Sequence, residues 1–338
     1  MKESLLYTKL NQNKVQCHTC AHECFISENK AGFCGVRQNI NQKLFSLVYG
    51  KVVSEAVDPI EKKPFFHFLP GSQTYSYATV GCNLRCDNCQ NWQISQYPKL
   101  QKGGIIGQDR TPEQIVHEAK KNNCDSVAAT YTEPTVFLEF ALDVMRLAKQ
   151  ENLKNIWVSN GFMSKKTLDL IIPYLDAINI DLKFFDDKLY SKFCGAKLQP
   201  VLDNLKYLKQ QGVWVEVTTL VIPDITERSG GFCKIVEFIF NELGAETPWH
   251  VSRFSPEISY KLQNLFPTPI NTIKDAIACG KKIGLKNIYA GNVWDEDLEN
   301  THCPKCGTVV INRKNYETAC FFINGSCPKC GQTLDIIL

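Results

Sequence analysis

The sequence has no long apolar run, no low-complexity tract and no internal repeat, and each of these absences excludes a class of protein. A spanning helix needs at least about 18 apolar residues in a row, and residues 1–14 also lack the apolar core of a secretory signal. The balance of 44% hydrophobic and 22% charged residues excludes intrinsic disorder. We therefore expect an intracellular, cytoplasmic globular protein without a membrane partner.

A strong charge of either sign is also lacking. The 38 basic and 35 acidic side chains give a net charge of +3, so the composition does not indicate nucleic acid as a partner. A chain of 338 residues is long enough for two or three domains, or for one large α/β barrel with small additions.

Cysteine, in contrast, is abundant, with 16 residues. The chain is too long to be a small disulfide-stapled scaffold, and a reducing cytosol disfavours disulfides, so clustered cysteines indicate thiolate ligands for zinc or iron. Most of the cysteines fall into three clusters. We expect the others to pack in the core without a further role: Cys124, Cys194, Cys233, Cys279 and Cys320.

The middle of the chain alternates short β-branched or aromatic runs with longer amphipathic segments, which predicts βα units around a parallel sheet. The fold is then a doubly wound sheet or a full or partial barrel, with its chemistry at the carboxyl ends of the strands. Helices are expected at 112–122, capped by Thr111, and at 202–211. The predicted strands are 74–80, 126–131, 155–159, 177–182, 213–221, 249–254 and 287–290.

Cys82, Cys86 and Cys89 form a C-x3-C-x2-C pattern directly after the first predicted strand. Three thiolates this close on one loop can bind three irons of a [4Fe–4S] cube and leave the fourth iron open. A structural zinc ion would need a fourth ligand, and no further cysteine or histidine follows within the loop. The spacing therefore predicts an iron–sulfur cluster.

This motif and its setting resemble the radical S-adenosylmethionine (SAM) superfamily, in particular the branch of pyruvate formate-lyase activating enzyme. The radical SAM enzymes of the AmmeMemoRadiSam system are more similar still, because they share the run from Asp58 to Gly71, DPIEKKPFFHFLPG. The resemblance implies a full or partial (β/α)6 barrel, and a cluster whose open iron chelates SAM and cleaves it to a 5′-deoxyadenosyl radical. It also implies a low-potential electron donor, flavodoxin or ferredoxin, and partner proteins of that system.

One position of the motif departs from the family pattern. The residue before its last cysteine is usually aromatic and rests on adenine, but here it is Asn88. Adenine is then expected to lean on a backbone edge or on Trp92.

The resemblance also assigns cofactor contacts to the ends of the next two strands. Glu133 would accept a hydrogen bond from the amino group of SAM, and Ser159 and Asn160 would contact its ribose. Each assignment has a structural alternative. Glu133 at a helix N-terminus is stabilised by the helix dipole, and residues 159–161 have the composition of an ordinary turn.

Two further strands carry candidate residues. Asp181 and Lys183 end the fourth predicted strand, where the resemblance assigns them to the ribose and carboxylate of SAM; the alternative is a structural ion pair. His250 is placed late in the sixth strand, as a cofactor contact or as a satisfied core histidine. Arg253, at the mouth of that strand, is a candidate anchor for an anionic substrate.

Two CPKC knuckles stand near the C-terminus, twenty residues apart. Paired knuckles with all four positions filled are typical of a closed structural zinc ribbon, and a rubredoxin-type iron site is the alternative. The ligands would be Cys303, Cys306, Cys327 and Cys330.

The N-terminal segment carries a further tetrad, spaced C-x2-C-x3-C with one more distant cysteine. It fits zinc or an additional iron–sulfur cluster, and zinc is our first interpretation because no redox motif surrounds it. The ligands would be Cys17, Cys20, Cys24 and Cys34.

We therefore predict three domains: a cysteine-rich N-terminal metal-binding module at 1–71, a radical SAM barrel at 72–298 and a zinc ribbon at 299–338. The leading hypothesis is a radical SAM enzyme, of oxidoreductase type, that abstracts hydrogen from an unknown substrate. A second hypothesis is an activase that places a glycyl radical on a partner protein. The third is a non-catalytic zinc-binding adaptor for nucleic acid or protein.

Overall fold

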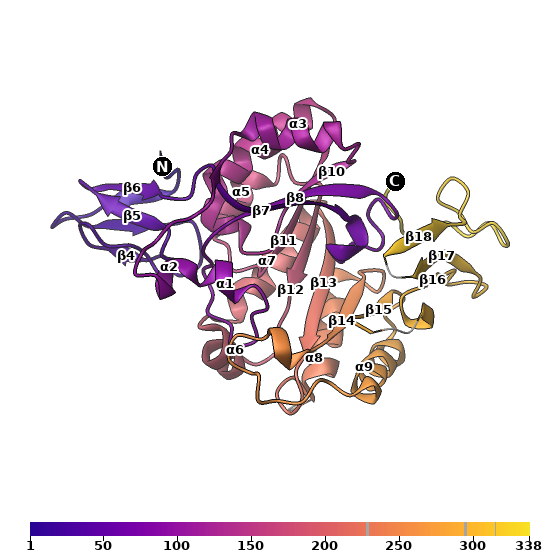
Figure 1. Ribbon diagram of the computed structural model, residues 1–338. Helices are drawn as coiled ribbons and strands as arrows, with labels where there is room; N and C mark the ends of the chain where they lie inside the picture. Colours follow the sequence, from indigo (N-terminus) through magenta and orange to yellow (C-terminus); the bar gives the residue numbers. More distant parts are fainter. Residues whose placement is uncertain (228–229, 294–295, 315) are drawn as a thin grey trace.

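The computed structural model describes residues 1–227, 230–293, 296–314 and 316–338. Its largest element is a nine-stranded sheet in the order β15-β14-β13-β12-β11-β10-β8-β7-β9 (Figure 1). All seven predicted strands are confirmed to within two residues, as parallel neighbours in this sheet. They are β8 (Gln73–Thr79), β10 (Ser126–Ala129), β11 (Lys154–Ser159), β12 (Ala177–Asp181), β13 (Trp214–Val221), β14 (Trp249–Arg253) and β15 (Ile288–Gly291).

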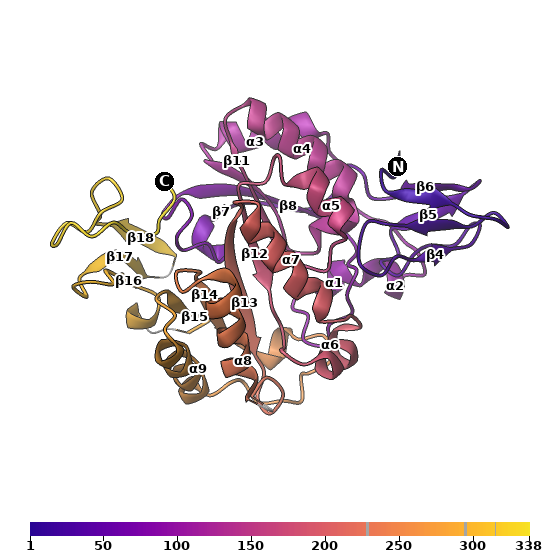
Figure 2. The ribbon, with the colours of Figure 1, turned by 180° about the vertical axis from the view of Figure 1, so that it is seen from behind.

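Helices cover the outer face of this sheet, as Figure 2 shows. They are α3 (Pro112–Lys121), α4 (Leu138–Gln150), α5 (Lys165–Ile171), α7 (Gln199–Gln210), α8 (Gly231–Phe238) and α9 (Ile270–Ile283). Thr111 caps α3 as predicted, in a reciprocal capping box with Gln114. The helix predicted at 202–211 is α7, which begins three residues earlier. None of the described helices is long and apolar enough to cross a membrane.

The sheet is open, because β15 and β9 (Gln108–Asp109) are its two edges and do not pair with each other in the described part of the chain. Its inner face is filled by the run that begins at Asp58. This run follows β7 (Lys51–Pro59), which pairs antiparallel with β8, and continues through a 3-10 turn, Ile60–Lys62. Its apolar side chains pack against the starts of three parallel strands, through Ile60, Phe65 and Phe68 on Ala128, Ile156 and Ala177. The sheet therefore includes chain that precedes the predicted boundary at residue 71.

The N-terminal module consists of two small antiparallel sheets. One contains β1 (Lys2–Glu3), β6 (Lys43–Ser46) and β5 (Arg37–Ile40), and the other β2 (Tyr7–Lys9), β3 (Val15–Cys17) and β4 (Phe25–Ile26). The module packs directly on the cysteine loop after β8. A Cβ atom on Gly81, whose φ is +102°, would lie 2.6 Å from Val36 Cγ1, so this contact requires glycine.

The C-terminal segment forms a three-stranded antiparallel sheet of β16 (Thr301–His302), β17 (Val309–Lys314) and β18 (Glu317–Cys320). It lies beside the run that fills the inner face: Ile337 N donates to the carbonyl of His67, and Arg313 donates to the carbonyl of Phe66. The ribbon is therefore attached at the end of the sheet where the parallel strands begin (Figure 1).

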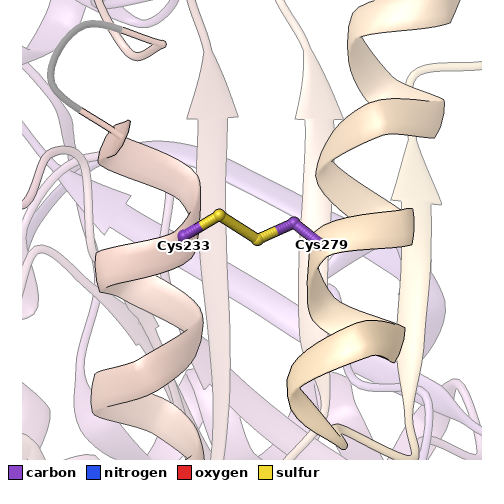
Figure 3. Close-up of a disulfide and its surroundings, with 2 residues drawn as sticks. All are labelled: Cys233 and Cys279. Atoms are coloured by element: carbon purple, nitrogen blue, oxygen red, sulfur yellow. A yellow bond between two sulfur atoms is a disulfide. The ribbon is translucent and has the colours of Figure 1, made fainter.

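The structure corrects the expectation that the isolated cysteines are all buried and unpaired. Cys124 and Cys194 are buried, but Cys320 is exposed, and Cys233 and Cys279 form a disulfide between α8 and α9 (Figure 3). The two helices pack side by side on the outer face, which brings the Cα atoms to 6.0 Å although 46 residues separate them in sequence.

Candidate active site

The three motif cysteines lie on the loop between β8 and two short helices, α1 (Trp92–Ser95) and α2 (Tyr97–Leu100). Cys86 is buried, and Cys82 and Cys89 are partly exposed. Two of the sulfurs already have hydrogen-bond partners. The amide of Leu84 donates to Cys82 Sγ at 3.3 Å, and the hydroxyl of Ser95 lies 3.3 Å from Cys89 Sγ. Such contacts stabilise thiolate ligands and tune a bound cluster.

Cys194 also belongs to this site, which the sequence did not indicate. It ends helix α6 (Asp187–Cys194), and its carbonyl accepts a hydrogen bond from Arg85 N at 2.8 Å. A hydrogen bond with Cys194 and burial together raise the pKa of Cys86. The contact arises because α6 packs behind the motif loop, more than a hundred residues away in sequence, so a fourth thiol lies near the three that the motif supplies.

The spacing of the motif sulfurs fits a cluster better than a single ion. Among the described residues, the C-terminal cysteines are the set whose ligand atoms all lie within 4.8 Å of one another, and the motif cysteines are not so close. A single tetrahedral zinc ion at about 2.3 Å from each sulfur would require the closer spacing. The donor set at Cys82, Cys86 and Cys89 therefore fits a [4Fe–4S] cluster.

Glu133 is fully buried, and its carboxylate already has four donors. Oε1 accepts from the amide and hydroxyl of Thr135 and from Ser159 Oγ, and Oε2 accepts from Asn160 N at 2.9 Å. Each carboxylate oxygen offers about two lone pairs, so Oε1 is fully used and Oε2 has one donor among the described residues. The geometry supports the structural alternative, in which Glu133 caps the short helix that begins at Pro134 and holds the turn after β11.

Asn160 does reach the motif. Its Nδ2 donates to Asn83 Oδ1 at 2.8 Å and lies 3.7 Å from Cys82 Sγ, while its Oδ1 accepts from Phe162 N. Ser159 is turned toward Glu133 instead and accepts a bond from Gly161 N. Of the two predicted SAM contacts in the turn after β11, Asn160 therefore lies beside Cys82 and Ser159 does not.

Asp181 and Lys183 form an ion pair of 2.8 Å at the carboxyl end of β12. Burial would lower the pKa of Lys183, but Asp181 and the nearby thiols of Cys86 and Cys194 raise it, so its ammonium stays charged beside the motif. Asp181 is the more exposed partner, with 37% of its side chain accessible. Both the predicted cofactor role and the structural ion pair are compatible with this position.

The structure corrects the position of His250. It is the second residue of β14 rather than a late one, and its Nε2 lies 2.6 Å from Glu216 of β13. Burial would raise the pKa of Glu216, but the contact with His250 lowers it. The Glu216 oxygens also accept hydrogen bonds from the amides of Phe66 and His67. His250 is therefore a satisfied interior histidine that helps hold the run starting at Asp58, and sequence reasoning missed its partner Glu216.

Arg253, the last residue of β14, donates from Nε to the carbonyl of Thr268 at 2.7 Å. It is partly exposed at the carboxyl end of the strand, as predicted. A contact between Arg253 and the motif cysteines is not found among the described residues.

A second interior cluster was also missed by sequence reasoning. Asp58 accepts from Lys62, from Lys63 at 2.7 Å and from the hydroxyl of Tyr131, and Lys63 lies 4.1 Å over the Tyr131 ring. Burial lowers the pKa of Lys63 to about 8. The carbonyl of Tyr131 accepts from Asn91, two residues after the last motif cysteine, so Tyr131 connects this cluster to the cysteine loop.

Asn88 is buried, and its Oδ1 has no hydrogen-bond partner among the described residues. Buried amide oxygens are nearly always bonded, so a ligand donor is expected there. Trp92, the alternative support for adenine, is stacked on Tyr260 with ring centroids 5.3 Å apart.

The two terminal cysteine sets differ in geometry. In the ribbon, Cys303 and Cys330 have sulfurs 3.6 Å apart, as do Cys306 and Cys327, so the four can bind one ion. The N-terminal cysteines line one pocket but are more widely spaced.

Sequence comparison relates the chain to several known proteins. Residues 76–233 match the sequence profile of the Radical SAM superfamily. The chain is 44% identical, over its whole length and that of its relative, to an uncharacterized protein of Methanocaldococcus jannaschii. It is 22% identical to the pyruvate formate-lyase-activating enzyme of Clostridium pasteurianum over 213 residues, which cover 58% of this chain and 84% of that enzyme.

Solved structures show the same fold. Streptococcus suis SuiB bound to its precursor peptide SuiA superposes with a TM-score of 0.50 at 15% identity, over 69% of this chain and 51% of SuiB. A radical SAM methyltransferase from Sphaerobacter thermophilus gives 0.50 at 13% identity, over 66% of this chain and 67% of that enzyme. These two structures share the fold of the chain. Its likeness to the Radical SAM superfamily rests on the profile match over residues 76–233, which include the three-cysteine loop that follows β8.

Proposed function

We propose that the protein is a radical SAM enzyme that abstracts hydrogen from a substrate bound near the carboxyl ends of the parallel strands. The observation that carries this is the convergence on one loop: Asn160 from the end of β11 and the Lys183–Asp181 pair from the end of β12 both lie beside the motif sulfurs. When bound, a [4Fe–4S] cluster supplies the electron that cleaves the sulfonium of SAM to a 5′-deoxyadenosyl radical.

The residues of the chain would bind and orient SAM. The partly exposed Asp181 carboxylate can accept from ribose hydroxyls, and the Lys183 ammonium can donate to the carboxylate of SAM. The unpaired Asn88 Oδ1 can accept from the exocyclic amine of adenine, so a hydrogen bond would replace the aromatic contact usual in the family. Glu133 would position Asn160 rather than touch the cofactor.

The substrate side would be polar. The backbone of Tyr131 contacts the motif loop, and its side chain reaches Asp58 and Lys63 inside the sheet. Arg253 stands at the carboxyl end of β14 as the candidate anion anchor. Catalysis would need a low-potential donor, flavodoxin or ferredoxin, because cleavage of the sulfonium demands the low end of the cluster range of about −700 to +450 mV. We also propose that the protein belongs to the AmmeMemoRadiSam branch and acts with the partner proteins of that system.

The test is anaerobic reconstitution of the full chain with iron and sulfide. We expect a brown protein that, on reduction with dithionite, converts SAM into 5′-deoxyadenosine. The Cys86→Ala variant is the matched control and should lose the product. A colourless protein that binds only zinc would overturn the proposal and favour the third hypothesis, a zinc-binding adaptor.

A second candidate is an activase that generates a glycyl radical on a partner protein. It is supported by the activating enzymes among the relatives, including the (2S)-3-sulfopropanediol dehydratase activating enzyme of Klebsiella oxytoca, 23% identical over 42% of this chain. Incubation with a candidate partner should then give a glycyl radical signal in electron paramagnetic resonance (EPR).

A further inference from the structure

The four N-terminal cysteines surround one small, mostly apolar pocket. Its lining also includes the apolar side chains of Ile26, Phe33 and Val136 and the polar residues Thr19, Arg37 and Thr135, and Cys17 and Cys34 are buried. Cys20 interacts electrostatically with the other three thiols, so all four lie close to a common centre. Four thiols around one pocket match the ligand sets that bind zinc or an iron–sulfur cluster.

The spacing of these sulfurs distinguishes between the two metals that the sequence left open. Tetrahedral zinc, about 2.3 Å from each sulfur, holds the four within about 4 Å of one another. The ribbon cysteines have that spacing, with sulfur pairs at 3.6 Å. Among the described residues, the N-terminal tetrad fails even the wider limit of 4.8 Å, as do the motif cysteines. Neither set is thus spaced for a single zinc ion, whereas an iron–sulfur core holds its ligands farther apart because several irons separate them.

A short path joins the tetrad to the motif. His22 stands between Cys20 and Cys24, and its Nε2 donates to the carbonyl of Asn83, the residue after Cys82, at 2.8 Å. Asn83 is fully buried. One hydrogen bond and a few covalent bonds therefore connect a ligand of one site to a ligand of the other.

Lys99 forms a second connection between the two sites. Its Nζ donates to the carbonyl of Cys82 at 3.1 Å, and the same ammonium interacts with the thiol of Cys34. The Cβ position of Gly81 lies 3.5 Å from the carbonyl oxygen of Cys34, so the two loops are in van der Waals contact. The positive charge of Lys99 is placed to stabilise anionic thiolates on both sides.

We propose that Cys17, Cys20, Cys24 and Cys34 hold a second iron–sulfur cluster, which passes single electrons through the His22–Asn83 contact to the motif site. The relay part of this inference rests on the proposed function, but the metal assignment does not. A low-potential one-electron donor is oxidised by one electron as the N-terminal cluster is reduced. That cluster is reoxidised when the motif site takes the electron, and no bond or proton changes place.

The metal assignment is tested on the wild-type chain after anaerobic reconstitution. We expect about eight irons per chain if both clusters are cubes, or about six if the tetrad holds a two-iron cluster, with about one zinc in the ribbon. About four irons with two zincs would overturn the assignment. The variant with Cys82, Cys86 and Cys89 changed to Ala should keep the extra iron and a reducible EPR signal, and loss of all iron from a folded triple variant would also overturn it.

This design separates the two proposals. If the proposed function is wrong and the motif binds no cluster, the triple variant contains as much iron as the wild type. If instead the tetrad binds no cluster, the wild type contains only the iron of the motif and the triple variant contains none. For the relay, His22→Ala keeps every cysteine and is compared with His117→Ala on the exposed face of α3. We expect at least a tenfold slower reduction of the motif cluster by reduced flavodoxin in His22→Ala only, at unchanged iron content. Equal rates in the two variants would overturn the relay.

Discussion

The imidazole of His22 hydrogen-bonds the backbone carbonyl of Asn83, with 2.8 Å between Nε2 and the oxygen. Because a carbonyl oxygen can only accept, the proton of His22 must be on Nε2. The ring also packs on Phe33 and Phe162, with centroids at 4.2 Å and 4.9 Å. Together with the packing of Val36 on Gly81, this side chain holds the N-terminal module against the cysteine loop of the candidate active site.

Cys86→Ala should abolish cluster binding at the motif, because two thiolates do not retain a cube whose fourth iron is already open. Cys194→Ala is the matched control, since Cys194 contacts Cys86 but lies outside the motif. We expect it to keep the visible iron–sulfur absorbance and the formation of 5′-deoxyadenosine. Loss of iron from a folded Cys194→Ala variant would instead make Cys194 a fourth ligand.

Glu133→Gln should lower the melting temperature more than it weakens SAM binding. The four donors around the carboxylate would face an amide that accepts at only one of its two ends, which costs about 1–3 kcal/mol. A direct contact with the SAM ammonium would instead reduce affinity about ten- to a hundredfold at unchanged stability. Thermal melts and a binding titration on the reconstituted variant distinguish these outcomes.

His67 should make the protein lose stability in mild acid. Burial lowers its pKa to about 4, and the neutral ring is held between the carbonyl of Asp335 and the hydroxyl of Tyr289. The unfolded chain takes up the proton near pH 6.5, so the contribution of His67 is complete above that pH and is lost as pH falls from 6.5 to 4. The loss amounts to about 3 kcal/mol.

The measurement for His67 is the free energy of unfolding between pH 4.5 and 7. His67→Gln should flatten the profile in this window, while the exposed His302→Gln leaves it unchanged. A profile of His67→Gln with the wild-type slope would assign the acid sensitivity to other groups.

Changing Cys303 and Cys306 to Ser should release one zinc ion and lower the melting temperature, because a closed four-thiolate site stabilises the fold of the ribbon. The ribbon contacts the Asp58–Gly71 run through Arg313 and Ile337, so that run should also exchange amide hydrogens faster. Cleavage of SAM should persist, since the ribbon is attached at the end of the sheet opposite the motif. Loss of cleavage in a folded variant would contradict this arrangement.

The sequence alone was sufficient for the features that depend on local order. Short β-branched or aromatic runs between amphipathic segments placed seven parallel strands to within two residues. The close spacing of Cys82, Cys86 and Cys89 indicated the radical SAM resemblance, because ligands on one loop remain neighbours in any fold. The same holds for the paired knuckles of the ribbon. These features need no long-range contact to be recognised.

Only the tertiary structure decided which distant residues meet. It placed Cys194 behind Cys86, paired Cys233 with Cys279, buried the carboxylate of Glu133 among four donors and gave His250 the partner Glu216. Apart from the two donors that Thr135 supplies to Glu133, these contacts join groups from different βα units or helices, brought together when the sheet and its helices pack. Such pairings depend on strand register and on the angles at which helices cross the sheet, which are properties of the packed core and leave no pattern in the local sequence.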